Sequence, residues 1–130
     1  MDKLINVLQS MEDFCSFSPV SKEKISAVEQ MLNLSFAQDY RDIIFNFGAI
    51  STNGHEIVGI CNSKRLDVLE VTKNEKQINL RIPDTFYVIE QTNIDGIVVW
   101  QDEFGRIYQT IANSEPKLIC MSLQEYLIEK

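Results

Sequence analysis

Residues 21–48 read S-K-E-K-I-S-A-V-E-Q-M-L-N-L-S-F-A-Q-D-Y-R-D-I-I-F-N-F-G and contain two consecutive helix patterns. The first pattern begins at Ser21, a residue type whose side chain caps a helix by accepting a hydrogen bond from a free backbone N–H. Apolar residues then recur three or four positions apart, which predicts an amphipathic helix over about residues 22–33. One face of this helix is therefore expected to lie on the core.

The second pattern is an apolar stripe from Phe36 to Phe47, which predicts another amphipathic helix. Ser35 and Gln38 are three residues apart and form a capping box that would start it. Gly48 tolerates the left-handed conformation in which many helices end. We therefore expect two helices in succession, and sheet after them.

The first twenty residues predict one more helix. Residues 3–14 carry apolar side chains at helical spacing, and Pro19 prevents this helix from continuing into the next. We interpret residues 1–20 as an N-terminal helix and linker within a single domain of residues 1–130. A chain of 130 residues is long enough to bury a core of its own without a metal ion or a disulfide.

Strand patterns dominate after Gly48. Gly59 interrupts one of them, and a glycine inside a strand indicates a bulge or a close approach of two backbone segments. The predicted elements are a turn at 51–54, a strand at 55–61, a helix at about 68–77 capped by Asp67, and a strand at 86–90. The β-branched residues of the region 68–77 would also suit a strand.

Residues 97–111 carry the clearest β pattern, two apolar runs around a turn that contains Gly105. A three-residue loop with this glycine in the left-handed region would place Asp102 opposite Arg106 and Trp100 opposite Tyr108. The aliphatic face of the hairpin should then lie on the helices. The face that carries Trp100 and Tyr108 should look outward, at least in part.

The end of the chain predicts a short strand at 118–121 and a helix started by the capping box of Ser122 and Glu125. The order of these elements predicts an α+β fold. We expect an antiparallel twisted sheet of about five or six strands, packed against N-terminal helices, with a C-terminal helix.

The cysteines argue against a disulfide framework and against a metal centre. Cys15, Cys61 and Cys120 are odd in number, far apart in the sequence and without a C-x-x-C pair. We interpret all three as small buried hydrophobic residues. The sequence also lacks a phosphate-binding glycine loop and a serine nucleophile motif, so we expect no cofactor, no metal and no catalytic residue.

The charge balance bears on partners. Twelve basic and nineteen acidic residues leave a formal charge of −7, which opposes nonspecific contact with nucleic acid or with an anionic membrane and attracts basic partners. Many proteins are acidic for solubility alone, so both interpretations stay open. No apolar run approaches the ~18 residues of a membrane span, and we see no signal peptide, so we expect a cytoplasmic protein.

Few residues of the sequence could take part in catalysis or in ligand binding. His55 is the single histidine, and we interpret it as a turn or strand-edge residue rather than a catalytic base. Asp95, Asp102 and Glu103 bring carboxylates to the two ends of one hairpin strand, where acids usually form turns. An enzyme that uses His55, Asp95 and Asp102 is the least favoured hypothesis. An aromatic pair such as Trp100 and Tyr108 serves either binding or stability, and the sequence leaves both open.

Together these residues resemble the SUKH superfamily, also called the Smi/Knr-like proteins, over about residues 21–128. The similarity lies in the order of several short motifs: Ile25-x-x-x-Glu29-x-x-Leu32, Phe36-x-x-Asp39-Tyr40-Arg41-Asp42-Ile43 up to Gly48, a strand with Gly59, Pro83-x-x-Phe86-x-x-Ile89, Asp95-Gly96-x-x-x-x-Gln101-Asp102-x-x-Gly105-x-x-Tyr108, and Ser122-x-x-x-Tyr126-Leu127. Ala37 replaces the usual proline at a helix start, and Ile94 replaces the usual glycine before Asp95.

The resemblance implies an α+β domain and, for most bacterial members, an immunity protein that neutralises a secreted or contact-dependent toxin, often a nuclease. We therefore expect a non-catalytic protein, a monomer or weak dimer, that binds a basic toxin domain. The alternative is a regulatory protein–protein interaction module of the Smi/Knr type. We place the partner-binding residues on the outer face and ends of the hairpin: Glu90, Asp95, Trp100, Asp102, Glu103 and Tyr108. The helix flank around Asp39 and Asp42 is the second choice.

Overall fold

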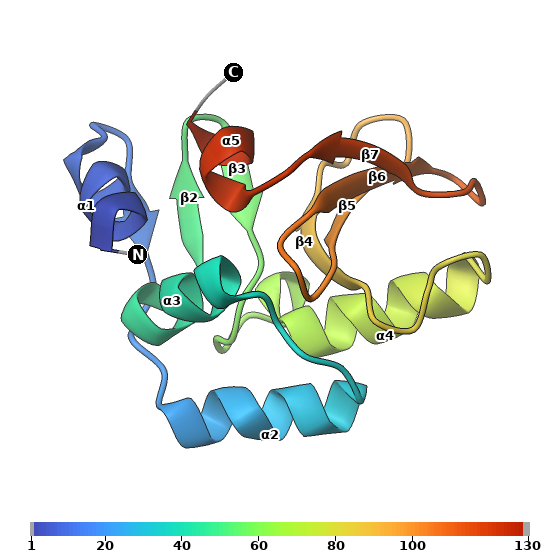
Figure 1. Ribbon diagram of the computed structural model, residues 1–130, viewed down its shortest axis with the longest axis horizontal. Coiled ribbons are helices and arrows are strands. Elements are labelled where there is room, and N and C mark those ends of the chain that lie inside the picture. The colour runs from blue at the N-terminus through green and yellow to red at the C-terminus, as the bar shows by residue number, and fades with distance from the viewer. Residues whose placement is uncertain (1, 129–130) are drawn as a thin grey trace.

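The computed structural model describes residues 2–128 of the chain, with helices and strands gathered around one hydrophobic cluster (Figure 1). The helices are α1 (Asp2–Ser10), α2 (Lys22–Leu32), α3 (Gln38–Phe47), the short 3-10 helix η1 (Lys64–Leu66), α4 (Val68–Ile78) and α5 (Leu123–Leu127). The strands are β1 (Cys15–Ser16), β2 (Ile50–Thr52), β3 (His55–Ile57), β4 (Tyr87–Gln91), β5 (Ile97–Gln101), β6 (Ile107–Ile111) and β7 (Lys117–Cys120).

The strands form two antiparallel sheets, one in the order β1-β2-β3 and one in the order β4-β5-β6-β7. The α+β class with antiparallel pairing is thus confirmed, but the strands divide between two sheets rather than forming one. Figure 1 shows α4 below the larger sheet, and α2 below α3. The two sheets meet where the backbone N–H of Val58 donates to the carbonyl of Ile89 at 2.9 Å, just after β3 ends.

The segment that follows β3 passes close to the end of α3 at two glycines, Gly48 and Gly59. Gly48 has φ +78° and ψ −64°, and the N–H of Ala49 donates across it to the carbonyl of Phe47 at 2.9 Å, which is a tight γ-turn rather than the left-handed helix end expected. The N–H of Ile60 donates to the carbonyl of Gly48 at 3.0 Å. A Cβ on Gly59 would lie 1.7 Å from the carbonyl oxygen of Gly48. The predicted close backbone approach at Gly59 is therefore confirmed.

The two central helices begin differently. Ser21 caps α2 as predicted, because its Oγ accepts from the N–H of Lys24 at 3.1 Å. The capping box predicted for α3 is wrong: the N-cap is Ala37, which has no side-chain cap. Its N–H donates instead to the buried hydroxyl of Tyr87 at 2.9 Å, fifty residues away. A tertiary hydrogen bond thus replaces the local one, which a sequence pattern does not reveal.

Three other expectations need correction. The first helix ends at Ser10, and β1 follows it, where the pattern predicted helix up to residue 14. Half of the predicted turn at 51–54 is strand, since β2 includes Ser51 and Thr52, and only Asn53 and Gly54 turn the chain with positive φ. Cys15 is exposed and Cys61 and Cys120 are only half-buried, so the interpretation of the three cysteines as buried residues is wrong. A two-residue strand is too short for its period to be detected, which is why β1 was missed.

The hairpin of β5 and β6 has the predicted register, with Trp100 opposite Tyr108 and Gly105 in the loop at φ +97°. The prediction that the face with Trp100 looks outward is wrong at Trp100, whereas the aliphatic face is buried as expected. Trp100 is fully buried, and Val98 and Thr110 of the same face line a small hollow together with Ile78 of α4. The opposite face is buried as well, at Val99 and Ile107. Both faces of the hairpin are therefore covered, and the aromatic face lies on α4.

The free edge of the larger sheet is β7, which pairs only with β6 among the named strands. Its register shifts by one residue, so that Leu118 faces Tyr108 and Cys120 faces Ile107. Such a bulge, together with Lys117 on the exposed strand, discourages pairing with another chain.

The predicted caps of α4 and α5 are confirmed, since Asp67 and Ser122 each accept a backbone N–H of their own helix. Across residues 2–128, every helix is too short or too polar to cross a membrane.

Candidate functional site

The six residues predicted to bind a partner are in very different environments. Trp100, Asp102 and Glu90 are buried, with exposed fractions of 0%, 3% and 5%. Tyr108 is half-buried and stacks on Phe86, at 4.6 Å between ring centroids. The remaining two, Asp95 and Glu103, are exposed. Their contact with a partner stays a prediction.

Glu90 joins the two sheets to α5. Its strand pairs beside β5 as expected, but its carboxylate points into the protein and accepts the hydroxyl of Tyr126 at 2.5 Å and the backbone N–H of Glu56 at 2.8 Å. Nδ1 of His55 lies 3.0 Å from the same carboxylate. Burial alone raises the pKa of Glu90, but these hydrogen bonds outweigh it and lower the pKa below its usual value. The carboxylate is therefore a structural group that the fold holds ionised.

We expect Glu90→Gln to lower the free energy of unfolding by about 1–3 kcal/mol at pH 7, because the new amide N–H groups face other donors. The pKa of Glu90 is lower in the folded state than its ordinary 4.5, so its contribution is fully present above that value. The contribution disappears as the pH falls through the folded pKa. Urea denaturation between pH 7 and pH 3 should show a smaller acid-induced loss in the variant. Glu103→Gln, at an exposed position, is the control, and equal pH profiles for both variants would contradict the prediction.

Asp102 organises the loop at one end of the hairpin. Its buried carboxylate accepts the backbone N–H groups of Phe104 at 2.9 Å and of Arg106 at 3.0 Å, the Nε–H of Arg106 at 2.8 Å, and the hydroxyl of Tyr108 at 3.2 Å. The hydrogen bond and charge of this carboxylate raise the pKa of Arg106. Asp102 thus stabilises the loop from inside the protein. Its neighbours Glu103 and Phe104 are the exposed residues of this loop.

Asp39 is the point where three segments meet, and we call its surroundings the Asp39 junction. One carboxylate oxygen accepts the Nε2–H of Gln101 from the hairpin at 3.1 Å, and the other accepts the backbone N–H of Leu123 at the start of α5 at 3.0 Å. Gly105 of the loop lies close as well, because a Cβ built on it would be 3.9 Å from the same carboxylate. Burial raises the pKa of Asp39 despite these hydrogen bonds. The sequence pattern indicated the helix flank around Asp39 as the second choice for the partner-binding surface. It did not indicate which segments Asp39 joins.

The structure separates the other candidate acids. Asp95 lies in the turn before β5 and Glu103 in the loop after it, so a five-residue strand stands between them, about 17 Å of extended chain. His55 contacts Glu90, whereas Asp102 contacts the loop, and no hydrogen bond joins His55, Asp95 and Asp102 among residues 2–128. No group of three or more potential metal-ligating side chains occurs in this described part either.

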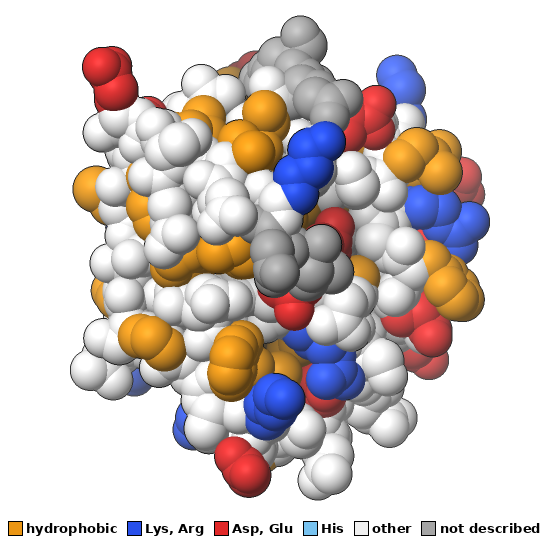
Figure 2. All heavy atoms as spheres, turned by 60° about the vertical axis from the view of Figure 1, so that its left-hand side comes forward, with side chains coloured by type: hydrophobic (Ala, Val, Ile, Leu, Met, Phe, Trp, Pro, Cys, Tyr) orange, Lys and Arg blue, Asp and Glu red, His pale blue; other side chains and the backbone are white. Residues whose placement is uncertain are grey.

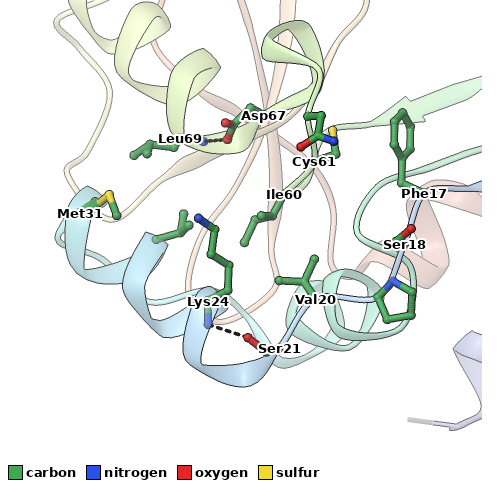
Figure 3. A pocket seen from close by; sticks show the side chains of 13 residues that line it. Phe17, Ser18, Val20, Ser21, Lys24, Met31, Ile60, Cys61, Asp67 and Leu69 are labelled. Carbon is green, nitrogen blue, oxygen red and sulfur yellow. Dashed lines mark hydrogen bonds between the residues drawn. The ribbon is translucent and has the colours of Figure 1, made fainter.

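A groove of about 480 Å³ opens between α2 and the start of α4. Figure 3 shows Lys24 extending from α2 toward Asp67 and Leu69, with Val20 and Ile60 on the opposite side. Burial raises the pKa of Asp67, and the Lys24 ammonium partly opposes that shift. The apolar side chains of its lining are Phe17, Pro19, Val20, Val28, Met31, Ile60 and Leu69. A groove of this composition fits an apolar side chain that carries or adjoins a charged group.

Sequence reasoning missed this groove because its lining comes from four separate segments. The sequence contains one indication of the groove: large apolar residues that lie outside the apolar faces of the predicted helices. Phe17 and Met31 are about half exposed, at 47% and 55%, and both lie at the groove. Figure 2 shows hydrophobic side chains in separate patches among acidic and basic ones on the face that it presents, so this face has no large field of one sign.

A comparison with known protein families identifies the family of the chain. A family model described as SMI1-KNR4 cell-wall, of the SUKH group, matches residues 1–124. The chain belongs to the SUKH family. The match confirms the resemblance that the sequence motifs indicated, and it extends it to the N-terminal helix. A search of curated proteins found no match to the chain.

The motif residues of this SUKH protein hold the fold together rather than forming a reaction centre. Gly48 and Gly59 are the two points of the backbone crossing. Gln101 bridges the hairpin to α3 and also accepts the hydroxyl of Tyr87 at 2.7 Å. Asp102 binds the loop that contains Gly105.

Proposed function

We propose that this SUKH protein is an immunity protein that binds one cognate toxin domain, which is basic and nuclease-like, and blocks the active site of that domain. Membership in the SUKH family carries the proposal. The formal charge of −7 supports a basic partner. The protein acts without a cofactor and catalyses no reaction. It works in the cytoplasm as a monomer or weak dimer. It competes with nucleic acid for the toxin and does not bind nucleic acid itself.

The binding surface that we propose is the solvent side of the Asp39 junction. Besides the buried Asp102, four acidic residues lie on the segments that meet there: Asp39 and Asp42 on α3, Glu103 on the loop, and Glu125 on α5. The one base of the loop, Arg106, is already paired with the carboxylate of Asp102 at 2.8 Å. An excess of acid on one side suits the lysines and arginines with which a nuclease holds phosphates.

The test begins with the gene next to the one that encodes this chain. An immunity protein should follow a large toxin, and the C-terminal domain of that toxin can be expressed in a bacterium with and without this protein. We expect growth to stop without it and to be restored with it. A domain with its catalytic residue replaced is the control for nonspecific toxicity. Full toxicity in the presence of folded protein, or no binding between the purified partners, would contradict the proposal.

The alternative is a regulatory interaction module of the Smi/Knr type. The words "cell-wall" in the family description favour it. This alternative predicts that deletion of the gene changes resistance to cell-wall stress in a strain that lacks the neighbouring toxin. The immunity proposal predicts that such a deletion has no effect there, so the same two strains separate the two functions.

A further inference from the structure

We infer that Phe104 is the anchor of the partner-binding surface: a preorganised aromatic side chain that inserts into an apolar pocket of a basic toxin domain. This inference rests on the proposed function and adds to it the residue and the kind of pocket that it fits. Phe104 lies at the tip of the loop between β5 and β6, and 74% of its surface is exposed.

The loop is held rigidly by hydrogen bonds. The N–H of Phe104 itself donates to the Asp102 carboxylate at 2.9 Å, and the N–H of Gly105 donates to the Asp102 carbonyl at 3.1 Å. The side chain of Gln101 donates to the carbonyl of Gly105 at 3.1 Å and to Asp39 at 3.1 Å. A residue on such a loop loses little conformational freedom when it binds, which favours affinity.

The burial of Asp102 makes this arrangement unusual. A carboxylate that is only 3% exposed is costly unless hydrogen bonds satisfy it. Here the bonds that satisfy it come from the loop backbone and from Arg106, so the carboxylate stabilises one loop conformation. That conformation holds the Phe104 ring out in solvent, where the guanidinium of Arg106 lies 5.3 Å from the ring centroid.

The surroundings of Phe104 resemble the centre of a protein interface. Ile107 pairs with Cys120, which places Met121 beside Arg106, and 59% of Met121 is exposed. Phe104 follows Glu103 in the loop, and the N–H of Met121 donates to the carboxylate of Glu125 at 2.7 Å, so each of these apolar side chains lies next to an acidic residue of the Asp39 junction. An apolar centre with charges around it is the usual arrangement of binding hot spots, where large aromatic side chains dominate the affinity. The partner pocket should be apolar with basic residues at its rim.

The experiment measures binding of the purified toxin domain by calorimetry for the wild-type chain, Phe104→Ala and Leu80→Ala. Leu80 is the matched control, because it is 85% exposed but follows α4 at the other end of the hairpin. We expect Phe104→Ala to weaken binding by about 30-fold or more and Leu80→Ala to change it less than about threefold. Thermal unfolding of all three proteins should coincide within a few degrees.

The outcomes separate the anchor from the function. Tight binding by the wild type and equally tight binding by Phe104→Ala would overturn the inference and leave the proposed function standing. Equal weakening in both variants would place the interface elsewhere and also overturn it. No binding by the folded wild type would overturn both. Restoration of affinity by Phe104→Tyr, which keeps the ring, would support insertion of an aromatic side chain.

Discussion

Gly59→Ala should unfold the protein or lower its free energy of unfolding by about 3 kcal/mol or more. The added methyl carbon would lie 1.7 Å from the carbonyl oxygen of Gly48 and 2.8 Å from its carbonyl carbon. Both atoms are backbone, so no side-chain rotation relieves the contact. The hydrogen bond from Ile60 to Gly48 and the one from Gly59 to Leu66 would have to lengthen. Urea denaturation followed by circular dichroism measures the loss.

The control is Gly54→Ala, because Gly54 has φ +80° but no atom within 4 Å of an added Cβ. This variant tests backbone strain without a clash, and we expect it to cost about 1 kcal/mol. Gly59 has no positive φ, so its substitution tests the clash without the strain. Equal midpoints for Gly59→Ala and the wild type would show that the two segments do not cross as closely as described.

Trp100→Ala should lower the free energy of unfolding by about 3–5 kcal/mol, the usual cost of removing a large aromatic side chain from a core. Trp100 has no exposed surface, and its Nε1–H donates to the hydroxyl of Thr110 at 3.0 Å. Its removal would leave a cavity between the sheet and α4, and an unpaired hydroxyl beside it. Any loss of toxin binding in this variant should follow from the loss of folded protein.

Two further variants show whether the effect comes from packing. Trp100→Phe keeps a ring and loses the hydrogen bond, so it should cost less than the alanine variant. Phe104→Ala removes an exposed aromatic residue of the same hairpin and should change stability by less than about 0.5 kcal/mol. If Trp100→Ala kept the wild-type unfolding midpoint and weakened only binding, the tryptophan would be a surface anchor after all.

These variants also show where the sequence interpretation of the hairpin was right and where it was wrong. Register follows from turn chemistry and side-chain alternation, both local, so the pairing of Trp100 with Tyr108 could be predicted. The orientation depends on which helix covers which face. Alternation in a strand separates two faces without saying which is inside, and here α4 covers the aromatic one while the aliphatic one is buried as well.

The sequence by itself determined the elements whose causes are local. Ser21, Asp67 and Ser122 each cap the helix that was predicted to start at them, and Gly59 marks the close approach of two segments. The family motifs likewise identified the SUKH family before any contact was known.

Only the tertiary structure decided what depends on contacts between distant segments. Tyr87 takes the place of a cap for α3, Glu90 turns inward to Tyr126, and Asp39 joins the loop to α5. Each of these contacts links residues between 36 and 84 positions apart, and each hydrogen bond is stronger in the low dielectric of the protein than it would be in water. A single-sequence pattern records the polarity of such a residue but not the partner that satisfies it. For the same reason the candidate surface moved from the buried Trp100 to the exposed Phe104.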